Sequence, residues 1–439
     1  MGSKLNIAGF GEELSNIEYK GFLDWFVAYN EPANLWRSHK SYLFCEAVFI
    51  IGAIIMFFHA LKQGGRWPFL YFAAIFHGFT VEFMAYFFPH IDNFWHAQGV
   101  FTFVERRLPL YVVFLYPVFY YHASWAMSKL KLKCGYVEHL AVGLLVVLID
   151  MPYDIIGAKY IHWIWHDTDP NVADRHYWVP WNSYYFHACF AASFQFFFHG
   201  TRKWFDKREL TKWQKGTISS ELISIVASAL LSMPGGCLLF IPLYHPLHDF
   251  LGVPSEVTTT TLLMVFTAIV WKFDRKSNRY SEPQKMNFLS KLLILHLVCH
   301  YAVQLLTAIF INPEDMISVG LHERTGNCRE MVPVETVLKT LQKRKYLCVT
   351  DYDEKYYDFH CLPNQKPPSD NSLWYTICGT EYENRAEYVT VLSLITFLAF
   401  VIFKSIHFDY DSRIVEKLSP KERENLERPV GQKKKSKSQ

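Results

Sequence analysis

The chain has 439 residues, of which 51% are hydrophobic, 17% are aromatic and only 19% are charged. Its length would suffice for two or three soluble domains, but its apolar blocks are too long and too numerous for one soluble chain to bury. The net charge of +3 is too small to indicate a nucleic-acid partner. We therefore expect an integral membrane protein that contacts membrane lipids and no nucleic acid.

Nine segments are long and apolar enough to cross a bilayer. A hydrocarbon core roughly 30 Å thick needs about 20 mostly apolar residues per helix, because lipid offers backbone groups no hydrogen-bond partner. The expected fold is an all-α polytopic bundle of about nine transmembrane helices. In chain order they cover residues 43–61, 67–88, 108–127, 136–156, 181–199, 218–244, 257–273, 289–311 and 388–407.

Composition divides the chain into five regions. The last region is rich in charge and typical of a disordered, basic cytosolic tail. The fourth is the ninth helix, which is separated from the other eight by a long polar insert. The regions are an N-terminal luminal segment (1–42), an eight-helix membrane bundle (43–311), a luminal insert with four cysteines (312–387), the ninth helix (388–407) and the tail (408–439).

Positive charge predicts the orientation of the bundle. Cytosolic loops are enriched in Lys and Arg, and here these residues gather in the loops that follow the first, third, fifth and seventh helices. With nine spans, the N-terminus is then luminal and the C-terminus cytosolic. The residues are Lys62, Arg66, Lys129, Lys131, Lys133, Arg202, Lys203, Lys207, Arg208, Lys212, Lys215, Lys272, Arg275, Lys276, Arg279, Lys285 and Lys291.

Four of the nine cysteines lie in the polar insert. In an oxidising compartment they favour two disulfides, and three connectivities are open. A zinc site is the alternative, although the insert holds no Cys-x-x-Cys pair. The four are Cys328, Cys348, Cys361 and Cys378.

The last residues, Lys435-Ser-Lys437-Ser-Gln439, are similar to the Lys-x-Lys-x-x signal that returns membrane proteins to the endoplasmic reticulum. We therefore expect that membrane as the location. A basic tail that touches anionic lipid is the alternative explanation.

Ionisable side chains inside a membrane span are unfavourable, so each needs a reason. Glu82 lies in the second predicted helix, Asp150 and Asp154 in the fourth and His187 in the fifth, all near the luminal ends. Asp150 and Asp154 are four residues apart and share one helical face. These four residues are the candidate catalytic groups.

A second set of side chains suits a metal. Zinc in enzymes takes about three protein ligands and a water, and histidines and an aspartate gather in two luminal loops. No specific zinc-binding motif occurs among them, and the cofactor is therefore left open between none and a divalent metal such as zinc. The candidates are His162, His166, His245, His248 and Asp249.

Four interpretations are open for these groups. A luminal-side pocket could use a carboxylate or His for general acid–base catalysis, or it could hold a catalytic metal. The carboxylates could line an ion or solute path in a transporter, or bond between helices in a non-catalytic scaffold. We favour an enzyme that acts on a lipid or isoprenoid, with transport second and a scaffold third.

One stretch, from about Leu70 to Ala192, carries a family resemblance. It holds Gly78 before Glu82, then Asp150-x-Pro152, Gly157 and Trp163-x-Trp165, and finally Tyr177-Trp-Val-Pro180-Trp-Asn182. This order resembles the membrane carotenoid hydratases and related carotenoid-biosynthesis proteins of prokaryotes, although Trp178 stands where that family has Gly. The resemblance implies a hydrophobic, isoprenoid or lipid-like substrate, and favours Glu82, Asp150 and Asp154 as acid–base residues. The whole chain also resembles an uncharacterised family of eukaryotic multipass membrane proteins, which implies the architecture and no activity.

Overall fold

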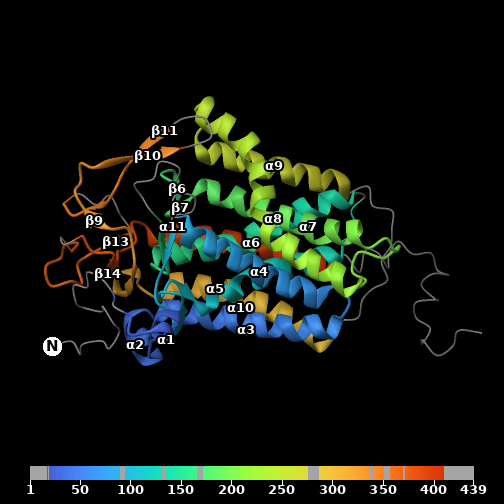
Figure 1. Ribbon diagram of the computed structural model, residues 1–439, viewed down its shortest axis with the longest axis horizontal. Coiled ribbons are helices and arrows are strands. Elements are labelled where there is room, and N and C mark those ends of the chain that lie inside the picture. Colours follow the sequence, from blue (N-terminus) through green and yellow to red (C-terminus); the bar gives the residue numbers. More distant parts are fainter. Residues whose placement is uncertain are drawn as a thin grey trace, which may run out of the picture.

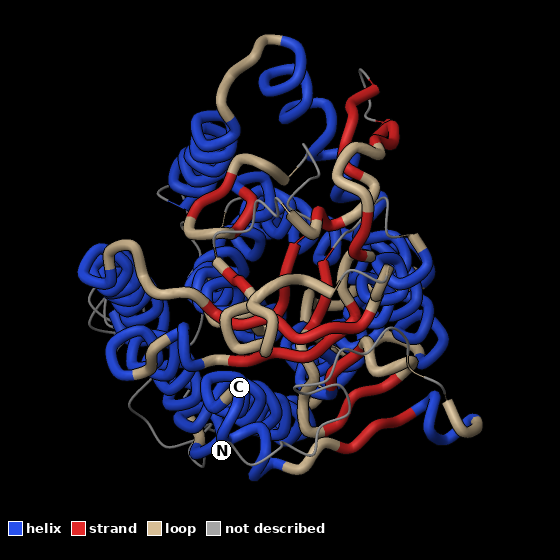
Figure 2. The backbone as a smooth tube through the Cα atoms, turned by 90° about the vertical axis from the view of Figure 1, so that its left-hand side faces the viewer, coloured by secondary structure: helices blue, strands red, loops and turns tan. Residues whose placement is uncertain are grey.

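The computed structural model describes residues 17, 19–88, 94–130, 132, 134–165, 172–274, 286–335, 340–350, 356–368 and 371–409, and all structural statements below concern these residues. Long helices run side by side along the longest axis, and the strands gather at one end (Figure 1). Figure 2 looks onto that end and shows strands lying in front of the helices. We call it the strand end, and the opposite end, which carries Lys62, Arg66 and Arg202, the basic end.

Each predicted span overlaps one long helix of the described chain. Seven helices are apolar and long enough to cross a membrane, by length and composition, which supports a multi-pass membrane protein. The other two, α5 and α7, are long enough but less apolar, so nine spans are not confirmed. The helices are α3 (Lys40–Gln63), α4 (Trp67–Phe87), α5 (Leu110–Ser128), α6 (Gly135–Lys159), α7 (Trp181–Phe205), α8 (Ile218–His245), α9 (Ser255–Asp274), α10 (Phe288–Phe310) and α11 (Arg385–Lys404).

Short elements join the helices at the strand end. Two short helices precede α3, and very short strands form one three-stranded antiparallel sheet, β1-β3-β4, and two antiparallel pairs, β2-β5 and β6-β7. The π-helical turn η1 extends α8 at this end, whereas η3 extends α11 at the basic end. The elements are α1 (Phe22–Phe26), β1 (Val27–Tyr29), α2 (Pro32–Ser38), β2 (Phe94–His96), β3 (Phe101–Phe103), β4 (Leu108–Pro109), β5 (Trp163–Trp165), β6 (Arg175–His176), β7 (Val179–Pro180), η1 (Pro246–Phe250) and η3 (Ser405–Asp409).

The cysteine-containing insert is built on β14, whose six residues are all buried in the sheet β13-β14-β8. Disulfides join Cys328 to Cys348 and Cys361 to Cys378, which confirms the predicted disulfides and selects one of the three connectivities. The elements are η2 (Pro313–Asp315), β8 (Ile317–Leu321), β9 (Thr325–Gly326), β10 (Met331–Glu335), β11 (Thr340–Arg344), β12 (Leu347–Cys348), β13 (Tyr357–Asp358) and β14 (Trp374–Gly379).

The insert is fixed to the bundle by buried polar contacts. Nζ of Lys159, at the end of α6, donates to Thr380 Oγ1 (3.1 Å) and to the Glu381 carbonyl (2.8 Å). The Tyr160 hydroxyl donates to the Ile311 carbonyl, 2.7 Å away, at the end of α10 and directly before the insert. One buried hydrophobic cluster also combines residues of α6 to α11 with residues of the insert. The insert therefore covers the strand end of the bundle.

Small residues allow α6, α7 and α8 to pack closely, as is common between helices in membranes. A Cβ at Gly143 would lie 2.4 Å from the Ala188 carbonyl oxygen of α7, and a Cβ at Gly235 would lie 2.3 Å from Ser193 Oγ. The Pro-Gly-Gly sequence of α8 thus serves contact with α7. The approach at Gly143 brings the α7 backbone next to His187 against α6, the helix that carries Asp150.

Candidate functional site

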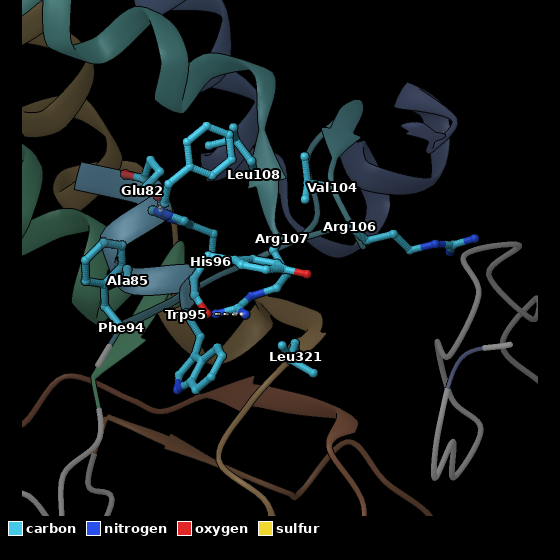
Figure 3. Close-up of a pocket in the computed structure, with 12 residues that line it drawn as sticks. Glu82, Ala85, Phe94, Trp95, His96, Val104, Arg106, Arg107, Leu108 and Leu321 are labelled. Atoms are coloured by element: carbon cyan, nitrogen blue, oxygen red, sulfur yellow. Dashed lines mark hydrogen bonds and ion pairs between the residues drawn. The ribbon is translucent and has the colours of Figure 1, made fainter. Parts of the chain in front are cut away.

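A pocket opens at the strand end beside α4 (Figure 3). Its cavity volume is about 30 Å³, within about 460 Å³ of space that includes open solvent. Apolar walls with a few polar groups are typical of ligand sites. The lining residues are Glu82, Phe83, Ala85 and Tyr86 from α4, Phe94, Trp95 and His96 from β2, Val104, Arg106, Arg107 and Leu108 from the segment before α5, and Leu321 from β8.

Glu82 is paired with His96 inside this pocket. Its Oε2 lies 3.1 Å from His96 Nε2, and its Oε1 accepts a hydrogen bond of 2.9 Å from the Tyr116 hydroxyl. Both members of the pair are buried, with side chains 9% exposed. When Glu82 is ionised, Nε2 of His96 must be the donor, so the lone pair is on Nδ1, a buried atom that no group among the described residues hydrogen-bonds. A carboxylate that orients an imidazole in this way prepares it as a base.

Gly78 creates the space for Tyr116. A Cβ at Gly78 would lie 2.4 Å from Cδ2 of the Tyr116 ring, so the ring packs directly on the glycine. Gly78 and Glu82 are four residues apart on α4 and share one face. The ring that lies over Gly78 can therefore extend its hydroxyl to Glu82. The Gly78…Glu82 spacing has a local structural cause.

Arg107 brings a positive charge to the pocket wall. Its guanidinium carbon lies 4.4 Å from the ring centroid of Tyr86 and 4.8 Å from that of Trp95, and Nη1 donates to the Tyr86 carbonyl at 3.4 Å. Burial lowers the pKa of Arg107, but guanidinium groups stay protonated in proteins. Arg106 points away from the Glu82–His96 pair (Figure 3). The pocket thus combines aromatic walls, a carboxylate–imidazole pair and one fixed cation.

The other three catalytic candidates form a second cluster. Asp150 and Asp154 on α6 and His187 on α7 each offer one ligand atom, and these atoms lie within 4.8 Å of one another. His187 Nδ1 is 3.2 Å from Asp150 Oδ2. None of the three lines the pocket at Glu82. The structure therefore divides the predicted catalytic set into two clusters instead of one.

His162, a predicted metal ligand, is packed in the interior. Its Nε2 lies 3.1 Å from Ser41 Oγ, and its ring is 5.3 Å from those of His39 and Tyr42. Burial holds the pKa of His162 well below its usual range, so the ring is neutral. His166 lies outside the described residues. The described contacts of His162 are those of a core histidine.

The remaining metal candidates lie after α8. His245 Nδ1 is 2.6 Å from Asp249 Oδ2, while His248 Nδ1 pairs with the Val253 carbonyl at 2.9 Å. His248 Nε2 is 4.0 Å from Asp249 Oδ1. These contacts describe a His–Asp pair and a helix-end hydrogen bond. Within the described chain they do not place three ligand atoms around one point, whereas Asp150, Asp154 and His187 do.

A second three-residue group, in the insert, cannot bind a metal through its cysteine. Asp358, His360 and Cys378 lie close together, but Cys378 is disulfide-bonded to Cys361, and metals bind the thiolate. His360 instead pairs with Asp358, with 2.5 Å between Nδ1 and Oδ1.

Three residues around Glu82 are not among the sequence candidates: His96 and Arg107, which line the pocket, and Tyr116, whose hydroxyl bonds to Glu82. Burial in a predicted span singles out Glu82, but His96 follows the span and Tyr116 belongs to another helix. The sequence did offer an indication for His96. A histidine shortly after a helix that carries a buried Glu can form an ion pair with that Glu. Arg107 is one of only a few basic residues in the predicted luminal loops, which is a second usable signal.

No curated protein and no solved structure matches this chain. A family model described as a domain of unknown function, DUF7802, matches residues 14–408. That range covers every long helix, the insert, the pocket at Glu82 and the Asp150–Asp154–His187 cluster. The chain therefore belongs to the DUF7802 family.

Proposed function

We propose that this protein is a membrane-embedded enzyme that uses the Glu82–His96 pair for general acid–base catalysis on a lipid or isoprenoid. One observation carries the proposal: a carboxylate and an imidazole 3.1 Å apart line an apolar pocket. A buried Glu that served only helix packing would not need to meet a histidine at a pocket wall.

We base a proton route on these hydrogen bonds. Nδ1 of His96 is buried in the structure, so the substrate must displace the side chains that cover it. Nδ1 then accepts a proton from the substrate, and the imidazolium that results is stabilised by the Glu82 carboxylate at Nε2. Tyr116 holds the other carboxylate oxygen and thereby fixes the orientation of Glu82. His96 then returns the proton to the product, so no net charge accumulates in the pocket.

The pocket lining supports an amphipathic substrate. Phe83, Phe94 and Leu321 offer apolar contact to a hydrocarbon chain, and Arg107 offers hydrogen bonds to an anionic headgroup. Glu82 lies five residues before the end of α4, or about 8 Å along the helix, which is a suitable depth for groups just below a lipid headgroup. The resemblance to carotenoid hydratases adds support for an isoprenoid.

We further propose that the strand end is luminal and that the protein resides in the endoplasmic reticulum. Both disulfides lie at the strand end, and disulfides persist in oxidising compartments. Lys and Arg gather at the opposite end, as expected of the cytosolic side. The retrieval-like sequence at residues 435–439 lies outside the described residues.

The test is untargeted lipid profiling of cells in which Glu82→Gln or His96→Asn replaces the wild-type protein. Both variants should raise the level of the same lipid, the substrate, and lower that of the same product, because each removes one member of the pair. Glu330→Gln and His360→Asn, exposed residues of the insert, are matched controls and should leave lipids unchanged. Unchanged lipids in both pocket variants at normal protein levels would refute the proposal in favour of transport or a scaffold.

A further inference from the structure

We propose that Asp150, Asp154 and His187 bind a divalent transition-metal ion at a site separate from the Glu82 pocket. The inference begins with their juxtaposition, since one carboxylate oxygen from each Asp and one ring nitrogen lie within 4.8 Å of one another. Two carboxylates and an imidazole are the ligand types of such metals in proteins.

The backbone positions these three groups firmly. Asp150 and Asp154 are one turn apart on α6 and share a face. His187 lies six residues into α7, beside the point where α7 contacts Gly143 of α6 with no room for a side chain. The three side chains thus project from two helices that cannot separate without losing close packing.

The second observation is a buried carboxyl oxygen without a hydrogen-bond donor. Asp150 and Asp154 are only 2% and 5% exposed, and their side chains hydrogen-bond to each other. Within the described residues Oδ2 of Asp154 accepts no hydrogen bond, and Oδ2 of Asp150 has only its 3.2 Å contact with Nδ1 of His187. A buried polar atom without a partner costs about 1–3 kcal/mol, and more when it is charged. A cation between the two oxygens removes this cost.

The charge balance favours a metal over a side-chain cation. The hydrogen bond between the two carboxyl groups requires a proton on one of them. Once that proton leaves, the neighbouring imidazole of His187 can supply at most one positive charge against two negative charges. A divalent ion neutralises both carboxylates while His187 binds it in the neutral form. Inside a membrane bundle an uncompensated carboxylate pair is especially unfavourable.

The ligand set also narrows the ion. Ca²⁺ takes six to eight oxygen ligands and Mg²⁺ retains several waters, whereas zinc-like ions accept three protein ligands that include nitrogen. The His187 side chain is 37% exposed, whereas that of Asp150 is 2% exposed, so the cluster is reached from the His187 side. We therefore assign the site to zinc or a similar first-row ion.

The experiment measures metal binding directly. Full-length protein in nanodiscs is stripped with a chelator, dialysed against Zn²⁺ and analysed for zinc per chain, and a parallel sample is titrated with Co²⁺ and followed by visible absorption. Wild-type protein should bind one ion per chain. Loss of a residue that only supports a metal ligand weakens metal binding roughly 10- to 100-fold. Asp154→Asn and His187→Gln each remove a direct ligand, so each should weaken Zn²⁺ binding by more than that.

Two controls make the result decisive. His245→Gln and Asp249→Asn remove a His–Asp pair elsewhere and should bind as wild type. Glu82→Gln should also bind as wild type, so failure of the metal site and failure of the enzyme are distinguishable. Should Asp154→Asn fail to fold, His187→Gln tests the site through a partly exposed side chain. Wild-type protein without bound Zn²⁺, or a His187→Gln variant with unchanged affinity, would overturn the inference.

Discussion

A buried ion pair at the basic end provides a quantitative test of the structure. Arg66, which precedes α4, contacts Glu221 in the first turn of α8, with 2.8 Å between Nε and Oε2 and 3.0 Å between Nε and Oε1. Both side chains are fully buried. Nη2 also donates to the Phe198 carbonyl at 2.7 Å, and the guanidinium lies 4.1 Å from the Phe198 ring centroid. The pair thus ties α4, α7 and α8 together.

Glu221→Gln removes the negative charge with almost no change of shape. The Arg66 guanidinium then stays buried without a counter-charge, and breaking a buried pair in this way costs about 3–5 kcal/mol. The exposed pair Lys345–Glu330, whose side chains are 43% and 44% exposed, is the matched comparison. Glu330→Gln should cost about 1 kcal/mol or less, because solvent screens exposed charges.

The assay is reversible unfolding in mixed detergent micelles, with the free energy of unfolding measured for each variant. The double variant Arg66→Met with Glu221→Gln lacks both charges. Its loss in free energy of unfolding should be smaller than the summed losses of the two single variants. If Glu221→Gln destabilises the protein no more than Glu330→Gln, Arg66 and Glu221 are not buried against each other and the contact between the start of α4 and the start of α8 is wrong.

Three further predictions concern the strand end. Gly78→Ala should lower the free energy of unfolding by about 1–3 kcal/mol, because its Cβ would lie 2.4 Å from the Tyr116 ring. Displacement of that ring should also reproduce the lipid change of Glu82→Gln. Gly135→Ala, with open space around it, should have neither effect. Burial lowers the pKa of His39 from 6.5 to about 4, so on acidification the unfolded chain binds the proton before the folded protein does. The contribution of His39 to the free energy of unfolding is therefore complete above pH 6.5 and falls by about 3 kcal/mol towards pH 4. His39→Gln should flatten this fall when the free energy of unfolding is measured against pH. Replacing Cys328 and Cys348 together by Ser should lower the free energy of unfolding by about 3 kcal/mol, because their disulfide closes a loop of about 20 residues. Peptide mapping of the unreduced wild-type protein should recover Cys328 linked to Cys348. Any other pairing would contradict the fold of the insert.

The helices were predictable because their cause is local. A run of apolar residues that meets lipid must satisfy its own backbone hydrogen bonds, so the predicted segment 67–88 nearly coincides with α4 (Trp67–Phe87). α5 and α7 are not among the seven apolar helices, and their tyrosines Tyr121, Tyr184 and Tyr185 are buried in the bundle. Strands of two or three residues left no measurable alternation in the sequence, so β2 and β5 were not predictable.

The sequence predicted how far along their helices the candidate residues lie, but not which side chains they contact. Spacing predicted that Asp150 and Asp154 share a face, and Glu82, Asp150, Asp154 and His187 were all expected near the luminal helix ends; that His187 is the group beside Asp150 comes from the structure. Glu82 lies at a similar depth, yet it faces His96 and Tyr116, because the direction of a side chain around the bundle depends on how helices pack. Disulfide connectivity has the same limit, since spacing alone does not choose among pairings.

The most direct test of the proposed enzyme is conversion of lipid by the purified protein. Wild-type protein in nanodiscs made with a total lipid extract of its host cells is incubated, and the lipids are measured by mass spectrometry over time. We predict loss of one lipid class and matching gain of a product with wild-type and His360→Asn protein, and none with His96→Asn. Folded wild-type protein that converts no lipid, or a His96→Asn variant that converts it equally fast, would contradict the account.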